Sequence, residues 1–357
     1  MASFLCDPPK QLALPDGFAF AHGTTIAPFA IVYETFGTLS PAKDNAILVC
    51  HALSPGAHAA GKYSDADASA GWWDGLIGFD GKGIDLARYF VVCVNFPGSP
   101  WGTTAPQTID PATGKPYGSR YPLVTVEDMI ESQRRVADHL GIARFAAVAG
   151  ASLGGMQVLM WAARYPERVG SLICMAAAAA VPVASVGWHL IGRKLIESDP
   201  AFRGGDYYGH PEKLRGLQLA RMVGHMTYLS EAALENKFGR RRRGDTRQFE
   251  VDSYLEYQAS KFAAAYDANS YIRVQHAMDE MDLVEQFGSL ATAFAGFRGR
   301  ALLISFDTDW LFPTSDLAQV QAAIAGAEHR VLATPNGHDA FLVDYHLIGP
   351  VVRDFLA

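Results

Sequence analysis

The stretch Phe145-Ala146-Ala147-Val148-Ala149-Gly150-Ala151-Ser152-Leu153-Gly154-Gly155-Met156 decides the fold of this 357-residue chain. It begins as an apolar run typical of a buried parallel strand, and an apolar helical run follows from Met156 to Tyr165. The turn between them, Gly150-x-Ser152-x-Gly154, matches the nucleophile elbow, which presents a serine at the carboxyl edge of a sheet. Glycines suit this turn because the serine backbone is strained and larger neighbours would collide with it. We therefore predict that Ser152 is a nucleophile; the alternative is a structural serine in a Gly-rich loop.

Strand-like runs recur on both sides of this turn. They lie at residues 31–36, 46–50 and 89–95 before it, and at residues 171–175, 301–306 and 329–332 after it. Helical spacing separates several of them, and one helix begins at Thr125, which forms a variant capping box with Asp128. Strands that alternate with helices predict an α/β fold with a mostly parallel sheet, covered on both faces.

This alternation stops between Pro182 and Phe297, where the chain shows helical spacing and no convincing strand. The chain is also long for one compact unit, which favours a core with an insertion. We predict an α/β core formed by residues 1–181 and 298–357, interrupted by an all-helical lid at residues 182–297, here called the helical insertion.

Composition restricts the function. Hydrophobic residues make up 49% of the chain and charged residues 19%, as in globular proteins with a large core. The net charge of −7 argues against a nucleic-acid partner, and the basic run from Arg240 to Arg243 is interpreted as a solvated helix end or loop. Four scattered cysteines indicate neither a disulfide framework nor a metal site. Residues 1–17 lack a signal-peptide pattern and no segment reaches membrane-spanning length, so we expect a cytoplasmic protein without a membrane partner.

A serine hydroxyl becomes a good nucleophile only when a neighbouring base removes its proton. After an elbow, the acid and the histidine follow on loops behind late strands. His338 follows the run at 329–332, and both Asp307 and Asp309 follow the run at 301–306. We favour Asp309, because the apolar Trp310-Leu311-Phe312 beside it would shield a buried carboxylate.

The negative charge that develops during acyl transfer needs two backbone donors. The N–H of Leu153, directly after the nucleophile, is one candidate. The second donor should come from the loop after an early strand, here His51-Ala52-Leu53-Ser54, and we choose Leu53. We interpret His51 itself as a structural histidine bonded to the loop backbone.

With these residues in place, the chain from about Phe20 onward resembles the homoserine O-acetyltransferase family of α/β-hydrolase-fold acyltransferases. The motifs that carry the resemblance are His51-Ala52-Leu53-Ser54, Ala57-His58, Gly71-Trp72-Trp73-Asp74-Gly75, Gly114-Lys115-Pro116-Tyr117-Gly118, Ser152-Leu153-Gly154-Gly155-Met156-Gln157, Gly204-Gly205-Asp206-Tyr207-Tyr208, residues 220–228, Asp309-Trp310-Leu311-Phe312-Pro313 and residues 337–342. The resemblance implies an α/β-hydrolase fold with an inserted helical lid. It also implies a homodimer formed through that insertion.

The family's catalytic triad falls on Ser152, Asp309 and His338, in agreement with the choice made from the residues. The implied reaction is ping-pong: the serine takes an acyl group from acyl-CoA, a co-substrate, and an amino-acid hydroxyl then attacks the acyl-enzyme. No metal or resident cofactor is implied. The resemblance places Arg221 and Tyr228 near the substrate carboxylate and Asp339 near its amino group, as a zwitterion requires. Without it, Arg221 could equally be a surface salt-bridge partner, and Asp339 a loop cap.

The resemblance therefore predicts a homoserine O-acetyltransferase of methionine biosynthesis. Two departures leave the acyl group and the acceptor open: the loop Pro97 to Pro106 differs from the family pattern, and Ala151 and Leu153 replace the common Gly and Met. Ser54-Pro55 is similar to the serine-acylating branch. The alternatives are a serine or homoserine O-succinyltransferase or O-acetyltransferase, and a carboxylesterase with the same triad. A noncatalytic binding module is disfavoured because all three triad positions are filled.

Overall fold

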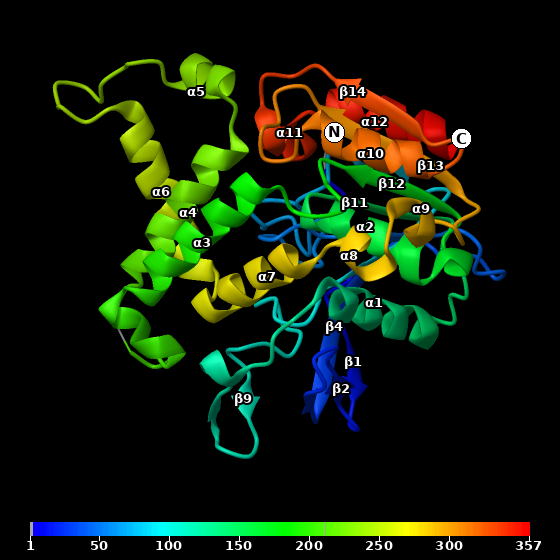
Figure 1. Cartoon of the computed structure of the whole chain (residues 1–357), viewed down its shortest axis with the longest axis horizontal. Coiled ribbons are helices and arrows are strands. Elements are labelled where there is room, and N and C mark those ends of the chain that lie inside the picture. Colours follow the sequence, from blue (N-terminus) through cyan, green and yellow to red (C-terminus); the bar gives the residue numbers. More distant parts are fainter. Residues whose placement is uncertain (1–2, 211) are drawn as a thin grey trace.

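An eight-stranded sheet forms the centre of the computed structural model, which describes residues 3–210 and 212–357 (Figure 1). In spatial order its strands are β1 (Lys10–Leu14), β4 (Phe29–Phe36), β8 (Phe90–Val94), β5 (Ala46–Cys50), β11 (Ala147–Ala151), β12 (Ser171–Met175), β13 (Arg300–Phe306) and β14 (Glu328–Leu332). The pairs β1–β4 and β4–β8 are antiparallel, and every other neighbouring pair is parallel. The predicted mostly parallel sheet is confirmed.

Apolar side chains cover both faces of this sheet. Helices α1 (Val126–Leu140), α2 (Leu153–Arg164) and α10 (Thr314–Ala323) share one buried cluster on one face, with Val136, Leu159 and Leu317 among its members. Helix α12 (Tyr345–Leu356) contributes to a second cluster, which also holds the fully buried Trp73. A parallel sheet needs this double cover because the strands are apolar on both sides.

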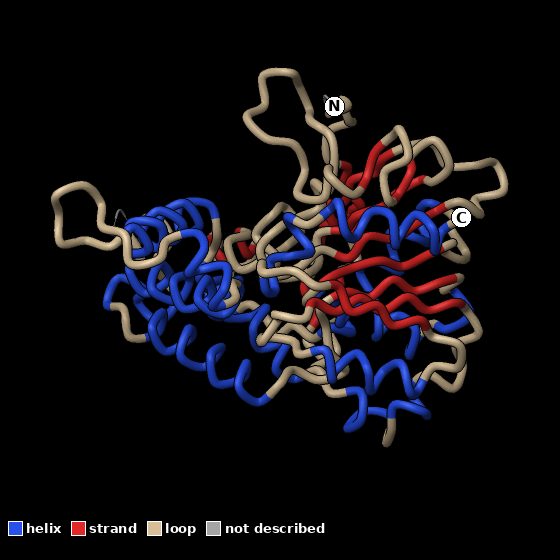
Figure 2. Tube along the Cα trace, turned by 90° about the horizontal axis from the view of Figure 1, so that it is seen from above, coloured by secondary structure: helices blue, strands red, loops and turns tan. Residues whose placement is uncertain are grey.

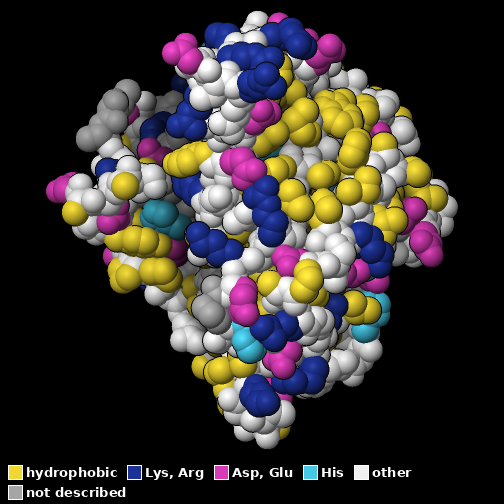
Figure 3. Space-filling view, turned by 90° about the vertical axis from the view of Figure 1, so that its left-hand side faces the viewer, with side chains coloured by type: hydrophobic (Ala, Val, Ile, Leu, Met, Phe, Trp, Pro, Cys, Tyr) yellow, Lys and Arg dark blue, Asp and Glu magenta, His cyan; other side chains and the backbone are white. Residues whose placement is uncertain are grey.

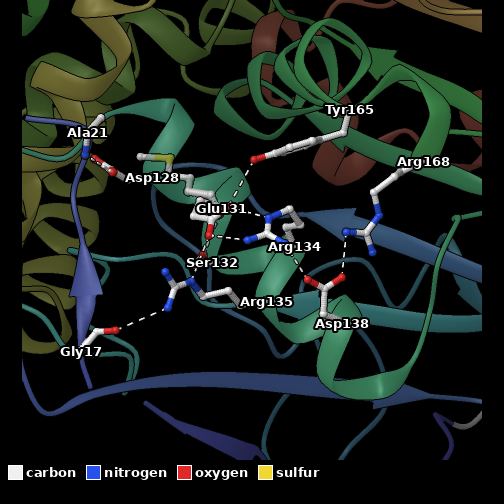
Figure 4. Close-up of polar contacts among 11 residues, drawn as sticks. Gly17, Ala21, Asp128, Glu131, Ser132, Arg134, Arg135, Asp138, Tyr165 and Arg168 are labelled. Atoms are coloured by element: carbon white, nitrogen blue, oxygen red, sulfur yellow. Dashed lines mark hydrogen bonds and ion pairs between the residues drawn. The ribbon is translucent and has the colours of Figure 1, made fainter. Parts of the chain in front are cut away.

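Helix α1 begins at the predicted capping box. Thr125 accepts a hydrogen bond from the N–H of Asp128, and the Asp128 carboxylate accepts one from the N–H of Thr125. The same carboxylate accepts from the N–H of Ala21, and Glu131 accepts from the hydroxyl of Tyr165 (Figure 4). These polar contacts tie α1 to the N-terminal segment and to the end of α2.

The helical insertion contains α3 (Val183–Glu197), α4 (Arg215–Tyr228), α5 (Glu231–Lys237), α6 (Glu250–Ala265), α7 (Ala268–Glu280), α8 (Leu283–Phe287) and α9 (Leu290–Ala293). Its helices α3 to α7 form a lobe beside the sheet (Figure 2), whereas α9 lies against α2 and α10 of the core, with α8 beside it (Figure 1). Among the described residues from 182 to 297, no strand is present beyond single-residue bridges. The helical content agrees with the sequence, whereas the division into domains stays a prediction.

Short elements complete the chain: β2 (Phe18–Ala19), β3 (Thr25–Ile26), β6 (Ile77–Gly78), β7 (Ile84–Asp85), β9 (Ile109–Asp110), β10 (Lys115–Pro116) and α11 (Ala340–Val343). In the part of the chain that the structure describes, no helix is both long and apolar enough to cross a membrane.

Candidate active site

The turn between β11 and α2 has the geometry of the predicted elbow. Ser152 has φ 57° and ψ −129°, a conformation that side-chain-bearing residues rarely adopt. A Cβ atom on Gly154 would lie 2.1 Å from the carbonyl oxygen of Cys50 in β5, and one on Gly150 would lie 2.5 Å from Gly154. Both positions therefore require glycine, because the start of α2 lies directly against the neighbouring strand.

Three side chains from loops at the carboxyl edge of the sheet form one hydrogen-bonded chain. His338 Nε2 lies 2.9 Å from Ser152 Oγ, and His338 Nδ1 lies 2.7 Å from Asp309 Oδ2. All three side chains are buried. This arrangement can move the serine proton to the imidazole while the carboxylate orients the ring and stabilises its cationic form.

The loop after β13 fixes the carboxylate. Asp309 Oδ1 accepts hydrogen bonds of 3.0 Å from the N–H groups of both Leu311 and Phe312, which leaves Oδ2 for the histidine. Asp307, the other candidate, is exposed and accepts instead from the N–H of Thr334. The distances thus bring Asp309, and not Asp307, to His338.

Two backbone N–H groups are free to bind an oxyanion. Neither Leu53 nor Leu153 donates its N–H to any other described residue. The Leu53 peptide is held by the hydroxyl of Tyr266, which donates to its carbonyl oxygen at 2.7 Å. Gln157 on α2 donates to the carbonyl of His51 at 3.1 Å, which fixes the same loop to the elbow helix.

His51 is a structural histidine, as expected. Its Nδ1 lies 2.8 Å from the carbonyl oxygen of Ala52, and its ring stacks on Phe96 with the centroids 4.2 Å apart. The ring is completely buried, and burial lowers the pKa of His51 to about 4. The ring is therefore neutral at physiological pH and supports the loop by packing.

A cavity of about 90 Å³ lies above the Ser152 hydroxyl. Its walls come from the core (Ala52, Leu53, Ser54, Pro55, Ser152, Leu311, His338, Asp339, Phe341 and Leu342) and from the helical insertion (His189, Arg221, Tyr228 and Met278). The insertion therefore lines part of the cavity beside Ser152 and supplies the guanidinium group of Arg221 to it.

Arg221 on α4 has no carboxylate partner among the described residues. Its Nη1 donates to Ser54 Oγ at 2.9 Å, and its guanidinium lies 4.3 Å from the ring centroid of Phe262 and 5.3 Å from that of Tyr228. Asp339 lines the same cavity, and burial raises the pKa of its carboxyl. The structure thus brings Arg221, Tyr228 and Asp339 together beside the nucleophile, with a cation free to bind an anion.

One feature of the cavity was not found from the sequence. His189 on α3 is 8% exposed, and its Nδ1 lies 2.5 Å from Asp279 Oδ1 on α7. Arg193, one helical turn further along α3, donates to Asp279 Oδ2 at 2.6 Å. The i, i+4 spacing of His189 and Arg193 was the available signal, but the partner aspartate lies 90 residues away.

Possible metal ligands also come together away from this cavity. Side-chain atoms of Cys6, Glu34 and His58 lie within 4.8 Å of one another. However, the Glu34 carboxylate already contacts His58 Nδ1 at 3.0 Å and accepts from the Tyr63 hydroxyl at 2.7 Å. These hydrogen bonds account for the buried carboxylate without a metal. Cys6, Cys50, Cys93 and Cys174 form no disulfide with one another.

The sheet order, the elbow and the hydrogen-bonded triad define a protein of the α/β-hydrolase-fold class. The family model described as "alpha/beta hydrolase fold" matches residues 45–345. The chain is 44% identical to a homoserine O-succinyltransferase of Burkholderia multivorans, over 95% of this chain and 94% of that protein. It therefore belongs to the homoserine O-succinyltransferase and O-acetyltransferase family, and it is an acyltransferase.

Solved structures agree with this assignment. The homoserine O-acetyltransferase of Bacillus anthracis superposes with a TM-score of 0.90 at 31% identity, covering 98% of this chain and 97% of that chain. Esterase E22 superposes with a TM-score of 0.89 at 27% identity, and the superposition covers 98% of this chain and 100% of the esterase chain. The predicted α/β-hydrolase fold is confirmed, and the same architecture also serves ester hydrolysis.

Proposed function

We propose that this enzyme transfers an acyl group from acyl-CoA to the side-chain hydroxyl of homoserine, through an acyl-Ser152 intermediate. The observation that carries the proposal is the pairing, in one small cavity, of a serine bonded to His338 with Arg221, which has no carboxylate partner among the described residues, and the half-buried Asp339. A nucleophile alone would fit any esterase. A nucleophile flanked by opposite charges fits an amino-acid acceptor.

The first half-reaction loads the enzyme. His338 Nε2 takes the Ser152 proton while Oγ attacks the thioester carbonyl carbon, and the oxyanion accepts hydrogen bonds from the N–H groups of Leu53 and Leu153. The C–S bond then breaks, and the imidazolium returns the proton to the leaving CoA sulfur. The acyl group remains on Ser152 as an ester.

The second half-reaction unloads it. His338 takes the proton of the homoserine hydroxyl, whose oxygen attacks the acyl-Ser152 carbonyl, and the Ser152 oxygen leaves with that proton. We assign Arg221 and Tyr228 to the homoserine carboxylate and Asp339 to its ammonium group. Pairing with the ammonium would offset the burial that raises the Asp339 pKa.

For the acyl donor we favour succinyl-CoA over the acetyl-CoA expected from the sequence. The curated relatives that share 43–44% identity with this chain are homoserine O-succinyltransferases, whereas acetyltransferases appear among solved structures at 31% and 26%. The cavity also contains His189, whose Nδ1–H donates to Asp279; a second N–H, at Nε2, exists only in the imidazolium form, and in that form it can donate to a second carboxylate. A plain acetyl group has no use for that donor.

Hydrolysis is the competing function, because esterase E22 shares the fold. Acyl transfer requires that water be kept from the acyl-enzyme, and the insertion residues that line the cavity beside Ser152 support transfer. We also propose a homodimer through the insertion, supported by the exposed apolar side chains of α3, with Val183 87% and Leu190 48% exposed. A monomer by light scattering at working concentrations would contradict the dimer.

The test is a donor-by-acceptor panel that follows thiol release and product mass. We expect rapid turnover with succinyl-CoA and L-homoserine, slower turnover with acetyl-CoA or L-serine, and little release without an acceptor. Ser152→Ala should retain the fold and lose turnover by a factor on the order of 10⁶. Release that does not depend on the acceptor would identify an esterase instead.

A further inference from the structure

A strongly basic segment lies on a protein whose net charge is −7. Residues 237–250, from the end of α5 to the start of α6, carry six basic and two acidic side chains. Basic side chains gather at the top of the face in Figure 3, at the level where α5 and the following loop lie in Figure 1. The four arginines from Arg240 to Arg243 are exposed. The proposed chemistry has so far given this segment no role.

Most of these cations have no counter-ion within the chain. Arg241 pairs with Glu250 at 2.9 Å. Among the described residues, Arg240, Arg242 and Arg243 make no ion pair with a carboxylate, and the guanidinium groups of Arg240 and Arg242 lie 5.4 and 4.2 Å from the ring centroid of Phe249. Contact with one aromatic ring holds two positive charges close together. Arg242 Nη1 donates to the carbonyl of Arg247, and the other N–H groups of the two guanidinium groups are available to a ligand.

A second cavity has lining residues from both regions. It measures about 400 Å³, and its lining includes Asp339, which also lines the cavity beside Ser152. The same lining includes Asn236 and Lys237, the last residues of α5. Ser230, the N-cap of α5, donates to the carbonyl of Pro335 in the loop that carries His338. Because α5 has seven residues and is about 10 Å long, the basic segment begins roughly one helix length from that loop.

We propose that the basic segment binds the phosphate groups of acyl-CoA, and that the cavity between Asp339 and Lys237 holds its pantetheine arm. This inference rests on the proposed function, for which acyl-CoA is the donor. It adds a binding site for the phosphate end of acyl-CoA, which lies far from the reacting thioester. Arg240 and Arg242 are the principal phosphate-binding residues.

The chemistry of the ligand fits this surface. CoA carries a diphosphate and a 3′-phosphate, and guanidinium groups bind phosphate oxygens through paired N–H donors. The pantetheine arm is apolar with two amide groups, and the cavity has apolar walls, including Leu229 and Val343, with amides at Asn236 and Asn336. An extended arm can cover the length of α5, so the thioester reaches Ser152 while the phosphates stay at the surface.

The experiment compares the double variant Arg240→Gln/Arg242→Gln with the wild type and with Arg298→Gln/Arg330→Gln, which removes two exposed charges from the core. Binding of CoA and of pantetheine, which lacks the phosphates, is measured by isothermal titration calorimetry. We expect the first variant to bind CoA about tenfold more weakly, because it loses two charge contacts that are partly exposed and each contribute little to the binding free energy. Its affinity for pantetheine should be unchanged. Higher ionic strength should weaken CoA binding more in the wild type than in this variant.

Steady-state kinetics test the same site in a second way. The value of kcat/KM for succinyl-CoA should fall about tenfold in the Arg240→Gln/Arg242→Gln enzyme, while that for S-succinyl-pantetheine should not change. Unchanged CoA affinity, an equal loss for both thioesters, or an equal loss in the Arg298→Gln/Arg330→Gln control would overturn the site. If wild-type enzyme binds CoA through these arginines but transfers no acyl group, the proposed function is wrong and the phosphate site stands.

Discussion

The α/β core and the helical insertion contribute different things to one cavity. The core supplies the proposed reacting groups Ser152, Asp309 and His338 from loops at strand ends, where hydrogen bonds hold them together. The insertion supplies Arg221 and His189 from the sides of helices. We infer that the core determines which bond is broken, and the insertion determines which molecules take part.

The two regions differ because of how their side chains are held. Parallel strands end at one edge, so residues far apart in the chain converge there whatever the neighbouring helices do. The position of a side chain on a helix depends on how that helix packs against its neighbours. Recognition residues on the helices can therefore change without disturbing the catalytic loops. If this separation is correct, core substitutions should affect both half-reactions, and insertion substitutions only one.

Among substitutions that leave the Ser152 hydroxyl in place, the largest effect is expected for Asp309→Asn. The amide would leave the hydrogen bonds from Leu311 and Phe312 in place but favour the wrong imidazole tautomer of His338. The rate of each half-reaction should therefore fall by about 10⁴. Acyl-enzyme formation by rapid quench and steady-state transfer would measure the two steps. The matched control is Asp307→Asn, which changes the other aspartate of the same loop and should retain activity. Equal losses in the two variants would mean that Asp309 acts through loop structure alone.

A smaller and selective effect is expected for Arg221→Ala. Loss of a charge-assisted contact to the acceptor carboxylate, worth about 1.5–3 kcal/mol, should lower kcat/KM for homoserine by roughly 10- to 100-fold. The burst of thiol release from the first half-reaction should keep its amplitude and rate. Arg215→Ala on the same helix is the control, because Arg215 pairs with Glu256 at the surface. If the burst of thiol release fell as much as the rate of transfer to homoserine, the roles of the core and of the insertion would not be separate.

The smallest effect concerns stability. Burial, and next to it the Asp309 charge, raise the pKa of Asp316 to about 6, above its ordinary value of 3.8. The charged form is therefore disfavoured in the folded protein, and stability is lost as the pH rises from about 4 to about 6. After allowance for partial exposure, Asp316→Asn should raise the free energy of unfolding by about 1 kcal/mol at pH 8 and by little at pH 4.

Thermal or urea unfolding at the two pH values measures this difference. Asp354→Asn, at an exposed aspartate of α12 with a side chain 79% exposed, serves as the control and should show no such pH dependence. A gain from Asp316→Asn of the same size at both pH values would exclude the proposed ionisation.

Much of the core could be predicted because its signals are local. The apolar run before Gly150 predicts β11, the glycines predict the turn, and Thr125 with Asp128 predicts the start of α1. The positions of Asp309 and His338 follow from chain order, since each comes directly after a strand that joins the same sheet.

The recognition residues could not be predicted in the same way. The contact between His189 and Asp279 depends on how α3 packs against α7, and the position of Arg221 depends on Phe262 of α6. Helical spacing in the sequence shows that these helices form, but not which faces meet. Arg221 was found only through a family resemblance, and His189 was not found at all.

The contact between the elbow and its neighbouring strand also restricts how this protein can acquire new substrates. Any side chain at Gly154 would collide with the Cys50 carbonyl oxygen at 2.1 Å, and one at Gly155 would meet Ala177 at 2.5 Å. Evolution or a protein engineer therefore has almost no freedom in the turn that holds Ser152. Changes of specificity have to be made in α3, α4 and the segment after α5, and a mutagenesis library confined to those helices should yield more altered enzymes than one centred on the nucleophile.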